Sequence, residues 1–230
     1  MLIRPFNYST WNTYLATMAQ ENRINLTSNN LANISTPGFK RDVPVFEGYI
    51  VKASKTDFQQ GPFESTENQF DVALSGPGFF QVETPQGIRY TRNGNFTLNN
   101  AGELVTMEGH RVGGNITVPD GVTEVRILTD GRVFADTNEI GQIDVVEFQD
   151  PNVLAKEGYS LFVPKADGVE AQPATQTTVE QGYLERSNAD PVRESVELID
   201  TLRTYEVFQK IAQTMQDINQ KNSNEVGRLT

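Results

Sequence analysis

Few side chains in this sequence could carry out chemistry. His110 is the single histidine, so a Ser-His-Asp triad or a multi-histidine metal site would have to be built around it. It lies in Met107–Arg111, which has the composition of a turn, and this favours an exposed histidine without a catalytic role. The chain has no cysteine, which excludes disulfides, thiolate metal sites and cysteine nucleophiles. We therefore predict no catalytic residue.

Two glycine-containing turns resemble ligand-binding loops only in part. Gly76-Pro77-Gly78 precedes a predicted strand rather than a helix and lacks the spacing of phosphate-binding loops. Asp130-Gly131 lacks the ladder of acidic residues that a calcium loop requires. Arginine is too sparse in the central part of the chain for a nucleic-acid-binding face. The sequence therefore predicts a protein that is not an enzyme, with no cofactor, no metal and no nucleic-acid partner.

The net charge of −11 is unevenly distributed. Residues 1–60 carry six basic and four acidic side chains, residues 181–230 carry six and eight, and the residues between carry seven and eighteen. An acidic middle repels nucleic acid, whereas nearly neutral ends suit close packing among many copies; an acidic surface is also common in soluble proteins. No apolar run has the length of a membrane span, and Met1–Trp11 lacks the apolar core of a secretory signal. We expect no membrane span and no cleaved signal peptide.

An amphipathic helix of about 20 residues is predicted near the N-terminus. Its stripe recurs every three or four positions and changes from apolar to amide-rich along the helix: Tyr8, Trp11, Leu15, Met18, Asn22, Leu26 and Asn29. Pro37 disfavours a helical conformation at Thr36, so we expect the helix to end by that residue. A type II turn would place Gly38 at positive φ, where valine would be strained and asparagine should be milder.

Three asparagines lie in the last turns of this predicted helix. Asn29, Asn30 and Asn33 compete with the backbone for hydrogen bonds, so they weaken a helix unless their amides find partners. Partners on another chain would explain them. The alternative is a frayed and solvated helix end.

A second amphipathic helix of roughly 30 residues is predicted from Val192 onward. Its stripe recurs at intervals of three or four without a strict seven-residue repeat: Val196, Ile199, Leu202, Tyr205, Phe208, Ile211, Met215 and Ile218. Asp190 is the predicted N-cap and Pro191 the first helical residue. A long helix with an apolar stripe needs a partner, and the other long amphipathic helix is the N-terminal one. We therefore expect the two helices to pair in a coiled-coil-like manner.

Residues 68–165 are predicted to form short strands separated by turns. Runs rich in apolar and β-branched residues alternate with residues that accept positive φ, such as Asn93-Gly94 and Asp120-Gly121. This spacing favours an all-β central domain of short twisted strands, sandwich-like or barrel-like, over alternating β and α units. The expected fold is mainly β with long terminal helices.

The 230 residues suffice for one such domain on a helical stalk. Residues 1–36 and 186–230 are expected to form the paired helical stalk, and residues 68–165 the β-rich domain. Residues 37–67 and 166–185 are poorer in apolar periodicity and richer in Gln, Thr, Ser and Pro, so we interpret them as connectors.

Several blocks of the sequence, in order, resemble the flagellar axial proteins, and the basal-body rod proteins most of all. The N-terminal block is the asparagine-rich helix end with its turn motif Thr36, Pro37, Gly38 and Phe39. The others open the predicted β domain, continue it, and flank the start of the C-terminal helix: Asp71–Val82, Tyr90–Phe96 with Gly102–Thr106, and Gly182–Asn188 with Ile199–Glu206.

The resemblance implies a structural subunit of the flagellar rod in the basal body. Such a subunit is exported unfolded by the flagellar type III apparatus and polymerises helically, with other rod proteins and copies of itself, into the periplasm-spanning drive shaft that transmits torque. The paired terminal helices would form the inner tube. The expected assembly interface follows the two helix stripes: Trp11, Leu15, Met18, Leu26, Asn29, Asn33, Val196, Ile199, Leu202, Tyr205, Phe208, Ile211 and Met215.

Within the family, the proximal-rod type fits best. The distal-rod type carries extra sequence before the β domain, whereas here only about thirty residues separate Phe39 from Phe70. Phe148–Leu154 and Tyr205–Ile211 also look similar to the proximal type. The alternatives are a distal-rod or other hook–basal-body axial subunit. Outside the family, they are a secreted β-rich enzyme or binding module, or a coiled-coil adaptor.

Overall fold

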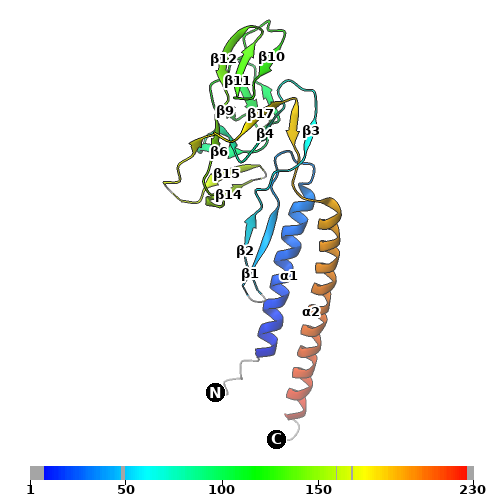
Figure 1. The fold of residues 1–230 in the computed structure, drawn as a ribbon. Coiled ribbons are helices and arrows are strands. Elements are labelled where there is room, and N and C mark those ends of the chain that lie inside the picture. The colour runs from blue at the N-terminus through cyan, green and yellow to red at the C-terminus, as the bar shows by residue number, and fades with distance from the viewer. Residues whose placement is uncertain (1–7, 48–49, 159, 167, 227–230) are drawn as a thin grey trace. The chain divides into compact units, whose positions relative to one another are not determined.

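The protein is described by a computed structural model that covers residues 8–47, 50–158, 160–166 and 168–226 (Figure 1). The described residues are mainly β, with one long helix near each end of the chain. They divide into two compact units. The first draws on Met1–Ala32, Asp42–Lys55 and Asp190–Thr230, and the second on Asn33–Arg41 and Thr56–Ala189.

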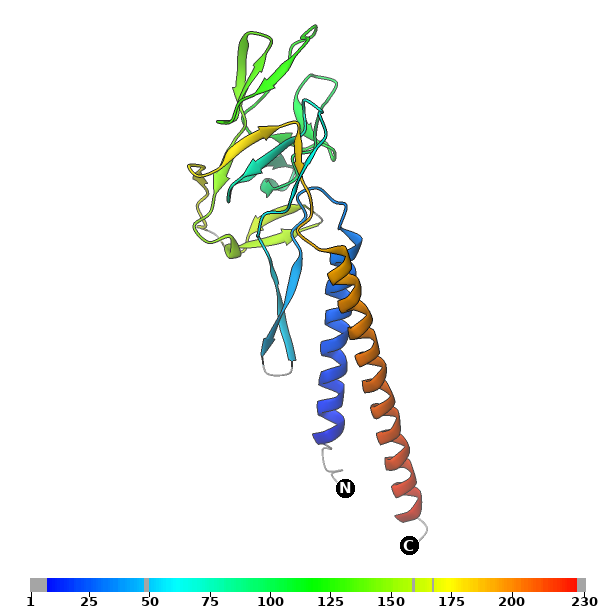
Figure 2. The ribbon, with the colours of Figure 1, turned by 45° about the vertical axis from the view of Figure 1, so that its right-hand side comes forward.

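The first unit contains helices α1 (Tyr8–Ala32) and α2 (Pro191–Val226) with strands β1 (Asp42–Glu47) and β2 (Ile50–Thr56). The two helices run side by side in opposite directions, as Figures 1 and 2 both show. The two strands pair with each other as a small sheet. Within the described residues, neither helix has an apolar stretch that could cross a membrane.

The helix boundaries follow from local sequence signals. Asp190 caps α2, because its carboxylate accepts hydrogen bonds from the backbone N–H groups of Val192 at 2.9 Å and Arg193 at 3.0 Å. Pro191 occupies the first helical position, as predicted. Helix α1 ends at Ala32, a few residues before Pro37, in agreement with the predicted stop by Thr36.

The second unit consists of short strands and one turn of 3₁₀ helix, η1 (Pro151–Val153). The strands are β3 (Phe63–Ser65), β4 (Val72–Ser75), β5 (Phe79–Thr84), β6 (Gly87–Thr91), β7 (Phe96–Leu98), β8 (Leu104–Thr106), β9 (Arg111–Val112), β10 (Val125–Ile127), β11 (Arg132–Ala135), β12 (Asn138–Gln142), β13 (Val145–Glu147), β14 (Leu154–Glu157), β15 (Leu161–Pro164), β16 (Gln172–Pro173), β17 (Thr178–Gln181) and β18 (Tyr183–Glu185).

The main sheet of this unit is open, with the strand order β14-β15-β6-β5-β9-β8-β7. Strand β13 pairs with β5 and with β16, and strands β10, β11 and β12 form a separate antiparallel sheet. Two further pairs join distant parts of the chain: β17 with β4, and β18 with β3. The all-β character expected for the middle of the chain is confirmed, whereas the sandwich-like or barrel-like closure stays a prediction.

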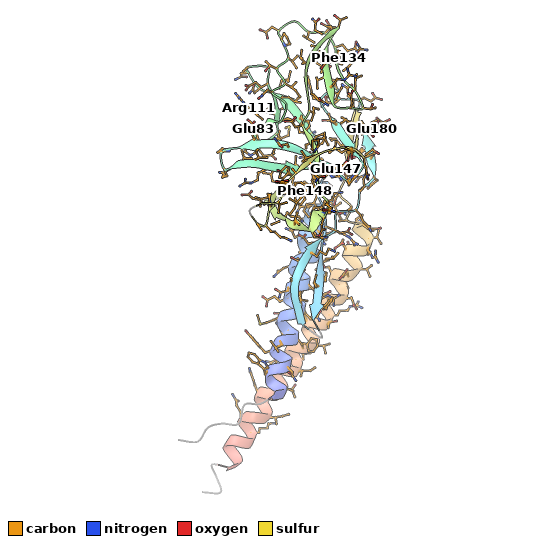
Figure 3. All side chains as sticks on the ribbon, turned by 60° about the vertical axis from the view of Figure 1, so that its left-hand side comes forward. Glu83, Arg111, Phe134, Glu147, Phe148 and Glu180 are labelled. Carbon is orange, nitrogen blue, oxygen red and sulfur yellow. The ribbon has the colours of Figure 1, made fainter. Side chains whose placement is uncertain are left out.

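Strand β5 separates two apolar cores. Neighbouring side chains of a strand point to opposite faces, and Phe79 and Phe80 accordingly belong to different clusters. Phe79 contacts the ring of Phe148 edge-on at 5.9 Å between centroids, whereas Phe80 meets Phe96 at 5.1 Å. Figure 3 shows Phe148 close to Glu147 at the end of β13, and Phe134 farther away on the β10–β11–β12 sheet.

Strands also occur in the segments that the sequence suggested to be connectors. Strands β1, β2 and β3 lie within 37–67, and β16, β17 and β18 lie within or border 166–185. Strand β3 is exposed along its whole length, and it pairs with a strand more than a hundred residues away, Phe63 opposite Glu185. An exposed strand of three residues needs no alternation of apolar and polar residues, so the sequence carries little signal for it.

Candidate assembly surfaces and the buried turn

One face of α2 is turned toward α1, and its positions repeat every seven residues. The buried and half-buried residues of this inner face follow spacings of four and three: Glu194, Leu198, Thr201, Tyr205, Phe208, Ala212 and Met215. Arg23 of α1 forms an ion pair with Glu197 at 3.2 Å, and the Thr13 hydroxyl lies 3.7 Å from Met215 Sδ. This is the spacing of coiled-coil packing. The apolar stripe that was predicted from the sequence mixed residues of this inner face with residues of the opposite face. For this reason it showed no strict seven-residue repeat.

The opposite, outer face of α2 exposes large apolar residues among charged ones such as Asp200, Arg203 and Glu206. Its apolar residues are Val192, Val196, Ile199, Leu202, Val207, Ile211 and Ile218. Val196 is 62% exposed and Ile199 is 52% exposed, which leaves most of both side chains in contact with water. Large apolar side chains that stay exposed along so much of one helix indicate an interaction surface. The outer face of α2 is therefore the first candidate assembly surface.

The exposed face of α1 changes character along its length. Trp11, Tyr14 and Met18 are exposed near its start, with the rings of Trp11 and Tyr14 5.8 Å apart. Asn22, Asn25 and Asn29 continue the same face at helical spacing, and all three are exposed. This face therefore offers aromatic surface at one end and amide groups at the other.

The residues expected at the assembly interface differ in accessibility. Those that are exposed are Trp11, Met18, Asn29, Val196, Ile199, Leu202 and Ile211. Those that are half-buried are Leu15, Leu26, Tyr205, Phe208 and Met215, and Asn33 is buried. Tyr205, Phe208 and Met215 belong to the inner face, whereas the α2 residues in the exposed group belong to the outer face.

Asn30 is satisfied within its own chain. Its side-chain amide exchanges two hydrogen bonds with the backbone of Asp42, each 2.9 Å long, and it donates to Glu194 Oε2 at 3.1 Å. The amide thus links α1, β1 and α2, and it is 3% exposed. For Asn30, the two explanations considered from the sequence, a partner on another chain or a solvated helix end, are both wrong. The side chain stabilises the first unit itself.

The Thr36–Phe39 turn lies in the second unit and has the geometry that was predicted for it. The N–H of Phe39 donates to the carbonyl of Thr36 at 3.3 Å, and Gly38 has a φ of +69°. The N–H of Gly38 donates to the carbonyl of Glu185 at 2.7 Å. A Cβ on Gly38 would lie 2.3 Å from the backbone of Arg92 and of Asn93. Position 38 therefore requires glycine for its φ and, independently, for the lack of space.

A buried ionic cluster lies beside this turn. Lys40 Nζ donates to Glu185 Oε1 at 2.5 Å and to the carbonyl of Gln59 at 2.7 Å. Arg92 lies 3.4 Å from the other oxygen of the same carboxylate, and the Gly61 N–H donates to Glu185 Oε1 at 2.8 Å. The side chains of Lys40 and Glu185 are fully buried, and that of Arg92 is 2% exposed. One carboxylate therefore serves two buried cations.

Burial dominates the electrostatics of the two cations. Loss of solvation lowers the pKa of Lys40 below its ordinary value, against the attraction of the Glu185 carboxylate, which favours the charged form. Burial lowers the pKa of Arg92 in the same way, again opposed by Glu185. The guanidinium of Arg92 also lies over the ring of Phe79, 5.0 Å from its centre. Glu185 is thus the group that makes these buried charges tolerable.

The ionic cluster brings together three of the sequence blocks that carry the family resemblance. The sequence did not predict this cluster. Lys40 follows the turn motif, Arg92 lies in Tyr90–Phe96, and Glu185 lies in Gly182–Asn188. Asn188 adds to this junction, since its side chain accepts from the Arg41 N–H at 2.7 Å and donates to the carbonyl of Asp57 at 2.8 Å. Each block contains or adjoins a charged residue, and these charges are the signal for the cluster that the sequence offers. Their spacing alone does not show that residues so far apart in the chain are in contact.

No catalytic constellation emerges in the part of the chain that the structure describes. His110 is half-buried in the turn between β8 and β9, where its backbone N–H lies 3.3 Å from the Thr106 hydroxyl. No group of three or more metal-ligating side chains comes together among these residues.

Three family models match separate parts of this chain. They are described as "Flagella basal body rod protein", over residues 16–40, "Flagellar hook protein FlgE/F/G D1 domain", over residues 73–135, and "Flagellar basal body rod FlgEFG protein C-terminal", over residues 180–225. The first and third matches contain Lys40 and Glu185, and the second contains Arg92. The ionic cluster therefore links all three matched regions.

Curated relatives align over nearly the whole chain. The flagellar basal-body rod protein FlgF of Caulobacter vibrioides is 32% identical over 233 aligned residues, covering 92% of this chain and 95% of the relative. FlgG of Buchnera aphidicola subsp. Schizaphis graminum is 33% identical over 255 residues, covering 94% and 98%. FlgF of Mesorhizobium japonicum is 30% identical over 207 residues, covering 83% and 86%.

Proposed function

This chain belongs to the flagellar basal-body rod protein family, and we propose that within this family it is a subunit of the proximal rod, of the FlgF type. Proteins of this family are structural components of the bacterial flagellum, and this chain is accordingly a structural protein of the flagellar basal body. The proposal adds the place in the rod, the surfaces used for assembly and the route of export.

The observation that carries the proposed mode of assembly is the composition of α2. Its inner face is covered by α1, whereas its outer face exposes Val196, Ile199 and other large apolar residues to water. At about 25 cal/mol per Å² of apolar surface removed from water, covering a strip of this length gives a large driving force for association. A monomeric role leaves this strip unexplained, while a packed helical assembly covers it.

The proximal position rests on length and spacing. The alignment with Buchnera FlgG runs over 255 residues and that with Caulobacter FlgF over 233, although the two cover similar shares of this chain. The FlgG relative therefore has more residues without a counterpart here. The short distance between the turn motif and β4 agrees with this. The distal-rod type is the second candidate, because the FlgG relatives are as similar in identity as the FlgF relatives.

In the proposed assembly, residues 1–36 and 186–230 form a paired helical stalk that contributes to the inner tube of the rod. Residues 68–165 form an outer β domain with sandwich-like or barrel-like closure, and 37–67 and 166–185 connect the two. The chain is exported unfolded by the flagellar type III apparatus without signal cleavage. It then polymerises with other rod proteins and with copies of itself, and it transmits torque across the periplasm.

Charged substitutions on the outer face of α2 should block assembly. Leu202→Asp and Ile211→Asp would each bury an unpaired carboxylate in the packed rod, at a cost of several kcal/mol per subunit. We expect secretion of the chain to persist while motility is lost and the amount of chain in purified basal bodies falls at least tenfold. Quantitative immunoblots of basal bodies and of culture supernatants measure both quantities.

Conservative variants at the same positions serve as matched controls. Leu202→Met and Ile211→Val keep the surface apolar, so swimming and incorporation should stay close to those of the unmodified strain. Normal swimming in both aspartate variants would contradict the proposal, because it would mean that the outer face stays in water in the assembled rod.

A further inference from the structure

A groove in the first unit lies between α1 and β2 and has a volume of about 320 Å³. Its lining is apolar at the base and polar at the edges: Leu26, Val51, Ala53, Asn22, Asn25 and Ser54. Val51 is buried and Leu26 is half-buried, whereas the other four residues are exposed. The groove therefore offers a concave apolar surface bordered by amide and hydroxyl groups.

We propose that this groove receives the outer face of α2 from a second copy of the chain, with Val196 and Ile199 as the inserted side chains. The inference rests on the proposed function. Identical subunits that polymerise helically join through two different patches, since each patch of one copy meets the other patch of the next. The outer face of α2 supplies the convex apolar patch, and the groove supplies a concave one in the same unit.

Charge complementarity supports this pairing. Arg203 is exposed on the outer face of α2, seven positions after Val196 and four after Ile199, so the three side chains share one side of the helix. Beside the groove, Glu21 is exposed and lies one turn before Asn25, whereas the exposed Lys55 follows Ser54 at the β2 edge. A docked α2 would bring its guanidinium toward this carboxylate and toward the amide oxygens at the edge of the groove, which suits the five donors of arginine.

Symmetry disfavours the simplest competing arrangement, in which the outer faces of two α2 helices pack against each other. Such a two-fold contact would close a dimer, whereas a rod needs contacts that propagate.

Disulfide cross-linking tests the proposal, and the natural chain contains no cysteine that would interfere. The variant carries Ser54→Cys and Ile199→Cys in one full-length chain, expressed in flagellated cells. Basal bodies are purified, oxidised mildly and separated on a non-reducing gel. A disulfide requires Cβ atoms about 4 Å apart, so one cysteine pair could miss the contact if the docked helix were slightly shifted along the groove. A second, independent double variant, Ala53→Cys with Val196→Cys, is therefore tested as well.

We expect at least one of these double variants to form a ladder of covalent multimers that collapses on reduction. The yield should be at least tenfold above that of either single variant. Multimers from Ile199→Cys alone, cross-links only to a protein of different size, or absence of ladders with the chain present in basal bodies would overturn the proposal. Absence of the unmodified chain from basal bodies would instead overturn the proposed function, and this inference with it.

Discussion

Replacing Glu185 by glutamine should lower the free energy of unfolding of the second unit by about 3 to 5 kcal/mol, the usual cost of removing one partner from a buried ion pair. Glu185 is 1% exposed and its carboxylate contacts both Lys40 and Arg92, so the substitution leaves two buried cations without the carboxylate that they share. Urea denaturation of the full-length chain, followed by circular dichroism in the β region, measures the loss.

The matched control for this prediction is Glu64→Gln. Glu64 pairs with Arg186 at 3.6 Å, but both side chains are more than half exposed. Exposed pairs contribute about 0 to 1 kcal/mol, so this variant should unfold almost like the unmodified protein. Similar losses in the two variants would show that Glu185 acts as an ordinary surface acid.

The effect of Glu185→Gln should also depend on pH. Without the carboxylate, burial still lowers the pKa of Lys40, and of the opposing attractions only the weaker one of Asp57 remains. Between this lowered pKa and the pKa of the unfolded lysine, the unfolded state binds more protons than the folded state, so stability rises with pH. Lys40 of the unmodified chain also has a lowered pKa, but a higher one than in the variant, so the deficit of the variant should shrink over the pH range between these two pKa values and stay constant above it. A deficit that grows over this range would contradict the assignment.

Gly38→Ala should destabilise the second unit by about 3 kcal/mol or more, from backbone strain and overpacking together. Gly38 has a φ of +69°, and its added Cβ would meet the backbone of Arg92 and Asn93 at 2.3 Å. These atoms cannot move aside as the end of a flexible side chain can. The same denaturation experiment measures the change.

Gly109→Ala separates the two contributions. Gly109 also has a positive φ, +87°, but nothing lies within 4 Å of the position that its Cβ would take. This variant should lose only the strain, about 1 kcal/mol. Equal losses at positions 38 and 109 would mean that the close approach to Arg92 and Asn93 contributes nothing.

The structure also changes the expectation for asparagine at position 38. From the sequence alone, asparagine should be milder than valine, because it tolerates positive φ better. The lack of space at Cβ applies to every side chain, so Gly38→Asn should be nearly as damaging as Gly38→Val. The sequence reveals the demand for positive φ through the Pro37-Gly38 pair, but not which backbone lies opposite.

Local signals in the sequence were sufficient where the cause is local. The cap at Asp190, the stop before Pro37 and the turn at Gly38 each depend on neighbouring residues, and all three were predicted. The two faces of α2 were not separated, because Ile199 and Tyr205 follow the same spacing of three or four although one faces water and the other α1. The distinction depends on which partner each face has.

Contacts between distant residues account for most of what the sequence did not show. Asn30 looks like a poor helix former, yet its amide pairs with the backbone of Asp42 and with Glu194. Lys40, Arg92 and Glu185 look like ordinary surface charges until the β3–β18 pairing and the turn bring them together. No periodicity marks such residues, because one buried ion cluster uses one residue from each segment.

Electron cryo-microscopy of purified basal bodies that contain a tagged chain tests whether the chain is a subunit of the proximal rod. A compact label is inserted at Gly158, because no atom lies within 4 Å of the position that a Cβ would take there. The strain that carries the label must still swim. We expect label density on the rod, in its proximal segment. Basal bodies with complete rods that carry no label, while the chain remains in the cytoplasm or in the medium, would contradict it.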